Sequence, residues 1–357
     1  MDIQNFIFSL FCCLLFSFFS GEKQVAEGAR LSWTSPSFVF RPKMLFAFGD
    51  SYADTGNSEI AVTRSWKFPY GITFPGKPSG RFSDGFVSTD YIASYLGMKT
   101  PVPYRWRKQV SGRVKDGMNM AYGGTGVFQT LISGPNMTTQ IDFLKQLLDD
   151  SVYTPRDLKT SVAHVSLSGN DYSTYYARNG SVAGLQAFIE SVVKQLMVNL
   201  KRIQELGVRR IGVSSLLPLG CIPLNTARFS FQRCNQTDNV FVQLHNHLLL
   251  QAVNTLNQQT NRTSFFVLDL YNAVDTILGK NQSQPGSPRF ENPLEPCCFG
   301  VSEEFECGSV DENGEKKYRL CSNPKSKFFW DGEHPSSQGW RAVYLSPAFQ
   351  DTLKQFL

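Results

Sequence analysis

The chain has 357 residues, of which 41% are hydrophobic and 13% aromatic, and it carries a formal net charge of +5 at pH 7. This apolar content is ample for one large core, and the absence of a low-complexity linker or an internal repeat excludes a repeat array. We therefore expect a single decorated domain. The mild basic charge comes with no nucleic-acid recognition motif, so nucleic acid is not expected as a partner.

The first twenty residues are typical of a secretory signal peptide. Phe6 to Phe19 is an apolar run interrupted only by serines, and it is too short to span a bilayer comfortably. The usual positive flank is missing, because the segment before the run carries Asp2 and no Lys or Arg. A buried N-terminal helix is the alternative. We expect residues 1–20 to be a signal peptide and residues 21–357 to be one domain with no transmembrane segment after cleavage.

Short apolar runs alternate with amphipathic stretches along the rest of the chain. The runs predicted to be strands are Met44–Phe48, Asn119–Ala121, Ser161–Leu167, Arg210–Leu217 and Phe265–Leu270. The stretches predicted to be helices are Ile141–Leu148, Leu185–Leu206, Val240–Leu256 and Ser337–Leu357. Strands that alternate with helices favour parallel pairing, so the expected fold class is α/β, a three-layer α/β/α sandwich with a mostly parallel central sheet.

Polar residues or glycines follow three of the predicted strands. Ser51, Gly124 and Asn170 all come just after a strand, where the chemistry of such sheets is placed. Taken alone, Ser51 in Gly49-Asp50-Ser51 reads equally well as the N-cap of a helix. The chain contains no Gly-x-Ser-x-Gly elbow, which argues against an ordinary α/β-hydrolase.

Near the C-terminus, the segment Asp331-Gly-Glu-His334-Pro supplies an aspartate and a histidine three residues apart. A serine hydroxyl becomes a useful nucleophile only with a base in hydrogen-bond reach and a third group that holds the base. The chain has four histidines. His164 lies in a predicted buried strand, and His245 and His247 lie in a predicted helix, so His334 is the candidate base.

Four blocks of the sequence occur in a characteristic order. They are Gly49-Asp-Ser51 within Phe-Gly-Asp-Ser-x-x-Asp-x-Gly-Asn, the glycine turn Gly123-Gly124, Gly169-Asn170-Asp171, and Asp331-x-x-His334-Pro. This set resembles the blocks of the GDSL esterase/lipase family, the SGNH hydrolases. Further segments resemble its secreted plant members: Gly80-Arg81-Phe82-Ser83-Asp84-Gly85, Pro218-Leu-Gly-Cys221-Ile-Pro223 and Cys297-Cys298. Two departures are Tyr52 in place of the leucine that gives the family its name, and Thr125 in place of alanine.

The resemblance implies a flavodoxin-like SGNH fold and a role for each motif residue. Ser51 would be the nucleophile, His334 the base and Asp331 the group that orients the base. The oxyanion hole would comprise the backbone N–H groups of Ser51 and Gly124 and the side-chain amide of Asn170, with Gly123 as the alternative to Gly124. Glycine suits this position because it permits close approach and unusual dihedrals. No cofactor and no metal are expected.

The expected function is therefore a secreted serine hydrolase that cleaves carboxylic esters, of acyl lipids or of acetylated compounds, through an acyl-enzyme. Two alternatives stay open. The same acyl-enzyme could transfer its acyl group to an alcohol. A catalytically silent cell-wall binding or interaction protein could keep the fold, although here every catalytic position is filled.

Cysteines and sequons both favour the secretory route. Removal of the leader leaves six cysteines, Cys221, Cys234, Cys297, Cys298, Cys307 and Cys321. An even number is typical of disulfides made in an oxidising compartment. The spacing suggests a pair between Cys221 and Cys234 and leaves the pairing of the other four open. Zinc is not expected, since no Cys-x-x-Cys pair occurs.

The N-glycosylation sequons are at Asn136, Asn179, Asn235, Asn261 and Asn281. Five sequons in a chain with a leader indicate a glycoprotein surface.

The densest basic stretch comprises Lys99, Arg105, Arg107, Lys108, Arg113 and Lys115. In a protein of the apoplast or cell wall, this stretch could favour an acidic polysaccharide. A solvated loop is the alternative interpretation.

Overall fold

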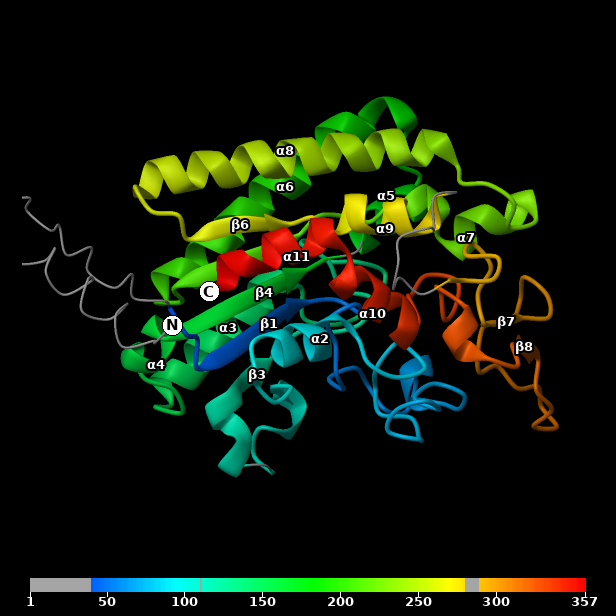
Figure 1. Cartoon of the computed structure of the whole chain (residues 1–357), viewed down its shortest axis with the longest axis horizontal. Helices are drawn as coiled ribbons and strands as arrows, with labels where there is room; N and C mark the ends of the chain where they lie inside the picture. The colour runs from blue at the N-terminus through cyan, green and yellow to red at the C-terminus, as the bar shows by residue number, and fades with distance from the viewer. Residues whose placement is uncertain (1–39, 110, 168, 280–288) are drawn as a thin grey trace, which may run out of the picture. The chain divides into compact units, whose positions relative to one another are not determined.

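Six strands form one parallel sheet in the order β2-β3-β1-β4-β5-β6 (Figure 1). The computed structural model describes residues 40–109, 111–167, 169–279 and 289–357, so the predicted signal peptide lies outside the described residues. The strands are β1 (Met44–Gly49), β2 (Val102–Pro103), β3 (Gly117–Asn119), β4 (Ser161–Ser166), β5 (Arg210–Ser214) and β6 (Phe265–Leu268). The strand β1, which leads to Ser51, lies in the interior of the sheet between β3 and β4.

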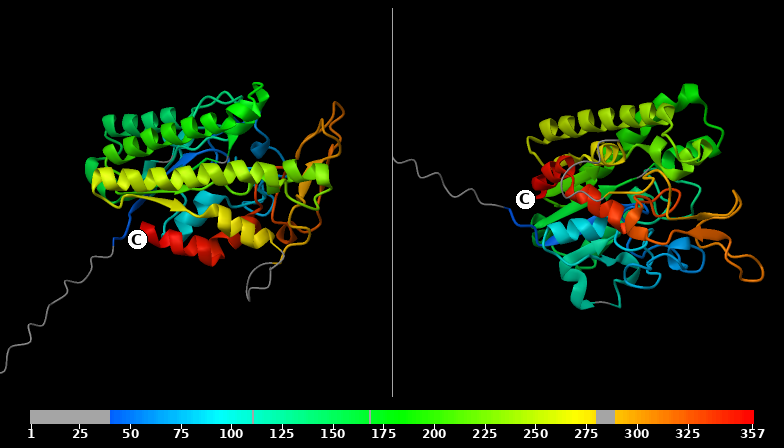
Figure 2. Two further views of the ribbon diagram at one scale, coloured as in Figure 1. Left: turned by 90° about the horizontal axis from the view of Figure 1, so that it is seen from above. Right: turned by 45° about the vertical axis from the view of Figure 1, so that its right-hand side comes forward.

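Helices cover both faces of the sheet, as the left view of Figure 2 shows. One layer contains α3 (Met137–Asp149), α6 (Val182–Glu205) and α8 (Gln236–Thr260). The other contains α2 (Ser88–Tyr95), α9 (Leu270–Leu278), α10 (Ser337–Leu345) and α11 (Pro347–Leu353). Along β1, Phe46 and Phe48 enter the first core and Leu45 enters the second, as the two-residue period of a strand requires. The α/β/α expectation is confirmed.

The structure has three further short helices within the described residues. They are α4 (Pro155–Lys159), α5 (Asn170–Ala177) and α7 (Pro223–Thr226). In the described part of the chain, no helix combines the length and the apolar character needed to cross a membrane.

The predicted strands and the three predicted internal helices are confirmed, with shifts at their ends. The strand expected at 119–121 occupies Gly117–Asn119, and the strand expected at 210–217 ends at Ser214. The three internal helices are each longer than predicted. Their apolar spacing covers only the turns that face the core, while side-chain caps such as Asn136 on α3 and Ser181 on α6 extend them outward.

The prediction of one final helix over Ser337–Leu357 is wrong, because the chain breaks at Ser346. Pro347 disfavours helical backbone at the preceding residue, and Ser346 is extended, with ψ of 138°. The Oγ of Ser346 then accepts from the N–H of Phe349 and caps α11. Two short helices and a final 3-10 turn (Lys354–Phe356) replace the single one.

A small hairpin, β7 (Cys298–Gly300) with β8 (Tyr318–Leu320), stands apart from the main sheet. Two disulfides, Cys297–Cys321 and Cys298–Cys307, tie this hairpin and its loop together. The expected pair Cys221–Cys234 is present. The hairpin segment is joined to the strand-like residues that precede Asp331, since the N–H of Cys298 donates to the carbonyl of Trp330 at 2.7 Å.

Candidate active site

Ser51 lies in the turn that follows β1, and its side chain is almost fully buried. The turn is fixed by two contacts of Gly49, whose N–H and C=O both bond the side-chain amide of Gln140 at 2.8 Å. Gly49 has a φ of +131°, and a Cβ there would lie 1.8 Å from the carbonyl oxygen of Ser166 in β4. Only glycine allows this approach, so the serine is presented at the carboxyl end of the sheet.

The structure brings Ser51, His334 and Asp331 into one hydrogen-bonded chain. His334 Nε2 lies 2.8 Å from Ser51 Oγ, and His334 Nδ1 lies 2.8 Å from Asp331 Oδ1. The backbone N–H groups of Glu333 and His334 also donate to Asp331 Oδ1, each at 2.9 Å. The three-residue spacing thus forms a tight turn in which the carboxylate holds both the backbone and the ring of His334.

The Asp331 carboxylate is fully enclosed and remains an acceptor. Tyr70 Oη donates to its second oxygen, Oδ2, at 2.6 Å. Burial alone would raise the pKa of Asp331. The attraction of His334 and of Arg64, together with the hydrogen bonds from His334 and Tyr70, outweighs burial and holds this pKa well below its usual range. Asp331 is therefore ionised and can stabilise a protonated imidazole.

Two aromatic rings flank the imidazole of His334. The ring of Phe82 lies 5.1 Å from it, and the ring of Tyr52 lies 5.7 Å from it in a T-shaped arrangement. Tyr52 Oη donates to the carbonyl of Glu333 at 2.7 Å. The residue that replaces the family's leucine therefore braces the loop that carries the histidine.

The glycine turn distinguishes the two candidate oxyanion donors. The N–H of Gly123 donates to Ser58 Oγ at 2.9 Å and to Asp54 Oδ2 at 3.1 Å. In contrast, the backbone N–H groups of Ser51 and Gly124 donate to no acceptor within the described residues. Gly124 has a φ of +77°, which favours glycine. This arrangement favours Gly124 over Gly123 as a donor for a substrate oxygen.

Asn170 begins α5 and lies beside the same turn. Its amide nitrogen Nδ2 is 3.0 Å from Asp50 Oδ2 and 2.9 Å from the carbonyl oxygen of Thr125. Both amide hydrogens therefore have acceptors in this structure. The side chain is placed near Ser51 and Gly124, and it also links the two loops that carry them.

A cavity of about 340 Å³ opens beside Ser51 and His334. Its apolar lining comprises Leu185, Ile189, Leu219, Ile222, Leu224, Phe241 and Val242, and its polar residues include Asn225, Arg228, Asp238 and Glu333. A volume of this size is at the lower end of small-molecule sites. Within the described residues, no group of three or more His, Cys, Asp or Glu side chains is arranged to hold a metal ion.

Other residues singled out from the sequence have structural partners. Arg81 forms a two-pronged ion pair with Asp90 of α2, at 2.9 Å for each contact. His164 is fully buried in β4, and His245 of α8 bonds the hydroxyl of Tyr172 through Nδ1 at 2.6 Å. None of these three residues contacts Ser51.

The sequons and the basic stretch are dispersed over the surface. Asn179 and Asn261 are exposed, Asn136 caps α3, and the amide of Asn235 donates to Asp238 Oδ2 at 2.6 Å. Asn281 lies outside the described residues. In the basic stretch, Arg105 Nε donates to the carbonyl of Asn57 at 3.0 Å, and Arg107 stacks over the Tyr104 ring at 3.8 Å.

Two residues beside the triad were not predicted from the sequence, Tyr70 and Arg64. Both lie in the long connection between β1 and α2, and their partners are more than 240 positions away. The nearby glycine-rich block from Gly80 to Gly85 was a sign that this connection matters, but it did not identify these two side chains.

Comparison with known proteins agrees with the geometry. The family model for GDSL-like lipase/acylhydrolase matches residues 45–345. The chain belongs to the GDSL lipase family. A GDSL esterase/lipase of Arabidopsis thaliana is 55% identical over 345 residues, which cover 96% of both proteins. A second one from the same plant is 50% identical over 348 residues, covering 96% of this chain and 97% of the relative. The protein is thus a carboxylic ester hydrolase.

More distant similarities extend across plants and bacteria. Acetylajmalan esterase 2 of Rauvolfia serpentina is 29% identical over 341 residues, covering 87% of this chain and 91% of the relative. An acetylxylan esterase structure from Geobacillus stearothermophilus aligns at 14% identity with a TM-score of 0.39, covering 87% of this chain and 94% of that one. The family assignment rests on the sequence matches, and the fold assignment rests on the sheet described above.

Proposed function

We propose that the protein is a secreted, glycosylated serine hydrolase that cleaves carboxylic esters through an acyl-enzyme on Ser51. The observation that carries this proposal is the buried chain Ser51–His334–Asp331, with contacts of 2.8 Å at each link, next to a cavity. A nucleophile, a base and an ionised group that orients the base are the parts that acyl transfer requires.

The proposed first half-reaction starts with attack of Ser51 Oγ on the ester carbonyl carbon. His334 Nε2 accepts the serine proton, and Asp331 stabilises the imidazolium. The N–H groups of Ser51 and Gly124, with the amide of Asn170, stabilise the negative oxygen of the tetrahedral intermediate. When the carbon–oxygen bond of the alcohol breaks, His334 returns the proton to that alcohol. Water then attacks the acyl-enzyme by the same route and releases the acid and Ser51.

The cavity supports an ester with an apolar group larger than acetyl. Six aliphatic side chains line the cavity, and burial of an apolar chain against them is favourable by about 25 cal/mol per Å². We expect kcat/KM for a series of 4-nitrophenyl esters to rise from acetate to medium-length acyl chains. Leu185→Trp should cancel that rise and leave acetate hydrolysis nearly unchanged. A wild-type preference for acetate would contradict the proposal for the cavity.

Secretion is supported by three disulfides, by the leader and by the two exposed sequons, Asn179 and Asn261. We propose the apoplast or cell wall as the destination. N-terminal sequencing of secreted material should begin between about Ser20 and Glu27. Material that retains Met1 would argue against a cleaved leader.

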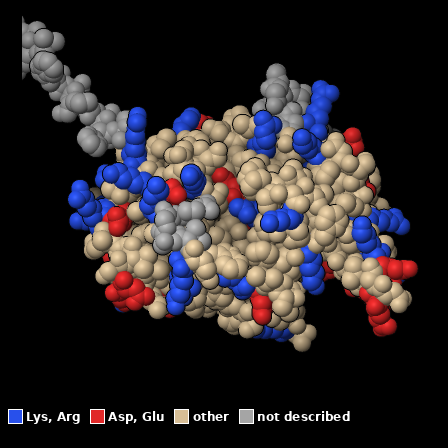
Figure 3. All heavy atoms as spheres, turned by 90° about the horizontal axis from the view of Figure 1, so that it is seen from below, with Lys and Arg blue, Asp and Glu red and all other residues tan. Residues whose placement is uncertain are grey.

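An acidic cell-wall polysaccharide is the proposed macromolecular partner. Figure 3 shows Lys and Arg side chains spread over one face, with fewer Asp and Glu side chains among them. Their charge would favour an anionic polymer, and such binding should weaken steeply with salt.

The direct test of the mechanism is labelling with a fluorophosphonate probe, followed by peptide mapping. We expect an adduct on Ser51 in the wild-type protein and none in Ser51→Ala, with the same fold by circular dichroism. An adduct on another residue would identify that residue as the nucleophile instead of Ser51. The absence of any adduct on folded protein would favour a binding role.

A further inference from the structure

We propose that Tyr70, which bonds the Asp331 carboxylate, and Arg64, which pairs with the neighbouring Glu306 and Glu333, are positioning residues. Together they limit the pull of negative charge on a protonated His334, so that the imidazole stays available to accept the proton of Ser51. This inference rests on the proposed function of the triad. Neither residue touches Ser51 or the cavity, so any effect they have on the reaction passes through Asp331 and its neighbours.

The contact of Tyr70 is specific to one carboxylate oxygen. Asp331 Oδ1 is saturated by two backbone N–H groups and the imidazole, whereas Oδ2 receives the Tyr70 hydroxyl at 2.6 Å as well as the imidazole at 2.9 Å. Tyr70 is fully buried, and burial, followed by the charge of Asp331, raises the pKa of its hydroxyl well above the usual value. The hydroxyl therefore remains a donor, and it draws off part of the carboxylate charge.

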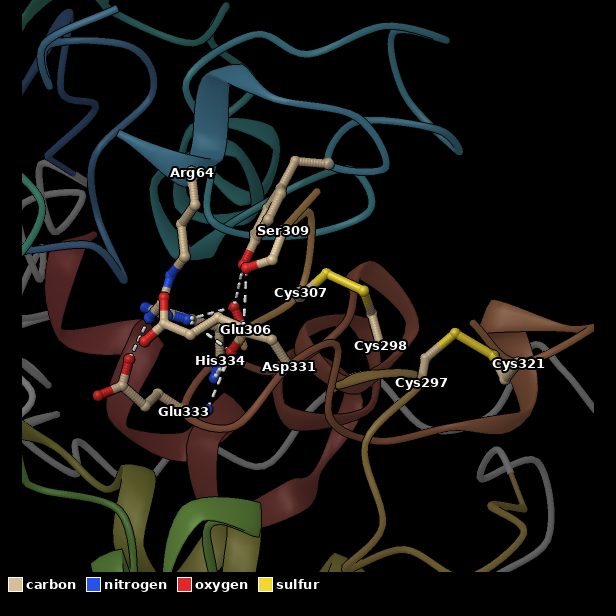
Figure 4. Close-up of a disulfide and its surroundings, with 11 residues drawn as sticks. Arg64, Cys297, Cys298, Glu306, Cys307, Ser309, Cys321, Asp331, Glu333 and His334 are labelled. Carbon is tan, nitrogen blue, oxygen red and sulfur yellow. Dashed lines mark hydrogen bonds and ion pairs between the residues drawn. A yellow bond between two sulfur atoms is a disulfide. The ribbon is translucent and has the colours of Figure 1, made fainter. Parts of the chain in front are cut away.

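Arg64 supplies the second restraint through charge. Its Nη1 lies 2.7 Å from Glu306 Oε2, and its Nη2 contacts Glu333 Oε2. Figure 4 shows the Arg64 side chain directed toward Glu306 and Glu333, beside Asp331 and His334. Without Arg64, the carboxylates of Glu306, Glu333 and Asp331 would be three negative charges near one imidazole. Such an excess would favour the protonated imidazole, which cannot accept the serine proton.

The other groups packed around His334 do not compensate the negative charge of these carboxylates. Its ring faces Phe82 and Tyr52 from two other elements, and Tyr52 bonds a backbone carbonyl rather than the triad. Burial, followed by the charges of Asp50, Glu333 and Asp331, raises the pKa of Tyr52 well above its usual value, so Tyr52 is neutral. Within the part of the chain that the structure describes, Arg64 is the one Lys or Arg side chain that pairs with Glu306 and Glu333.

The disulfide-bonded segment keeps both residues in place. Tyr70 packs in a small core with Cys297, Cys298, Cys307 and Trp330, and its ring lies 5.9 Å from that of Trp330. Glu306, the partner of Arg64, directly precedes Cys307 in the Cys298–Cys307 disulfide (Figure 4). The loop that orients Asp331 is therefore braced from the hairpin side.

The deciding variant is Tyr70→Phe, measured by the pH dependence of kcat/KM for one soluble ester. Loss of the hydroxyl leaves more of the Asp331 charge to hold the imidazolium. We expect the acid limb of the profile to move up by about 0.5 to 1 pH unit, and kcat on the plateau to fall by about threefold to tenfold.

Arg64→Met should move the acid limb in the same direction by about 1 pH unit or more. Arg64→Lys keeps the positive charge, so its acid limb should lie close to that of the wild-type protein.

Tyr153→Phe is the matched control. Tyr153 is also buried, and its hydroxyl donates to a single acceptor, the carbonyl of Val114 at 2.9 Å, away from the triad. We expect this variant to lose some stability without a shift of the acid limb. If Tyr70→Phe loses stability like Tyr153→Phe and its acid limb does not move, the proposal is wrong and Tyr70 is only structural. Failure of the wild-type protein to hydrolyse esters or to label at Ser51 would instead overturn the proposed function, so the two failures are distinguishable.

Discussion

Asn170 links the two loops that carry the proposed oxyanion donors. Its amide bonds Asp50 and Thr125, so the side chain has a structural task as well as the proposed catalytic one. We expect Asn170→Ala to lower kcat by about a hundredfold with little change in KM, because a donor to the oxyanion acts mainly in the transition state.

Asn246→Ala provides the control for this experiment. Asn246 is also half-buried, and its amide group bonds both the N–H and the C=O of Leu216, at 2.8 and 2.9 Å, outside the site. A comparable loss of stability with wild-type kcat is expected. If Asn170→Ala keeps kcat within a few-fold of wild type, the N–H groups of Ser51 and Gly124 serve the oxyanion without it.

At the scale of single residues, the sequence predicts those functional residues that lie within a short recognisable motif. Ser51, Asp331 and His334 were predicted because each lies in a dense polar block, and the structure brings them into contact. Tyr70, Arg64 and Gln140 were not predicted. Each is an ordinary residue type whose meaning comes from a partner far away in the chain, and one sequence carries no record of such pairs.

The hairpin of β7 and β8 is an element whose effect reaches the site. Removal of its disulfide in Cys298→Ser/Cys307→Ser should lower the free energy of unfolding by about 2.6 kcal/mol, from the loop entropy of a 9-residue separation. We also expect kcat to fall, because the N–H of Cys298 holds the carbonyl of Trp330, next to Asp331. Urea unfolding and steady-state kinetics measure the two effects.

The Cys221–Cys234 disulfide offers a contrast for that variant. Its separation of 13 residues gives a similar loss of about 2.9 kcal/mol. Its neighbours Leu219 and Ile222 line the cavity, so its removal should raise KM more than it lowers kcat. A Cys298→Ser/Cys307→Ser variant with wild-type kcat would show that the hairpin does not hold Asp331.

Helices and strands were predictable where the hydrophobic period of a segment agrees with the Gly and Pro residues that bound it. The long helix α6 has regular apolar spacing and ends two residues before Gly207, and its prediction is correct to within three residues. The last helix has the same spacing, but Pro347 divides it. Strands β7 and β8 have three residues each, too few for any alternation to be visible, and disulfides rather than a hydrophobic face define them.

At the scale of the whole described unit, parallel topology explains why residues that are distant in the sequence meet at the site. All six strands end at the same edge of the sheet, so Ser51 after β1 and Asn170 after β4 lie together although they are 119 positions apart. The alternation of strands and helices was enough to predict this edge. It was not enough to predict the strand order, because each pairing depends on contacts between distant segments.

The same buried core makes stability depend on pH. Burial lowers the pKa of His164 to about 3 and that of His245 to about 4. In the unfolded chain both titrate near about 6.5, so between these values the unfolded state binds more protons than the folded state. Stability is therefore fully present above about pH 6.5 and is lost as the pH falls toward 4. By pH 5 the two imidazoles should together lower the free energy of unfolding by about 4 kcal/mol.

His164→Leu isolates one of these two contributions. The Nδ1 atom of His164 is buried without a hydrogen-bond partner in the described structure, and only Nε2 contacts Ser214 Oγ, at 3.2 Å, so an apolar side chain of similar size loses one weak bond. We expect the difference in unfolding free energy between pH 7.5 and pH 5, measured by urea titration, to shrink by about 2 kcal/mol in the variant. The buried carboxyls Asp54 and Asp171, whose pKa values burial raises, act in the opposite direction at lower pH and are common to both proteins. An unchanged difference would therefore mean that acid destabilises the fold through other groups, and that His164 takes up its proton without unfolding.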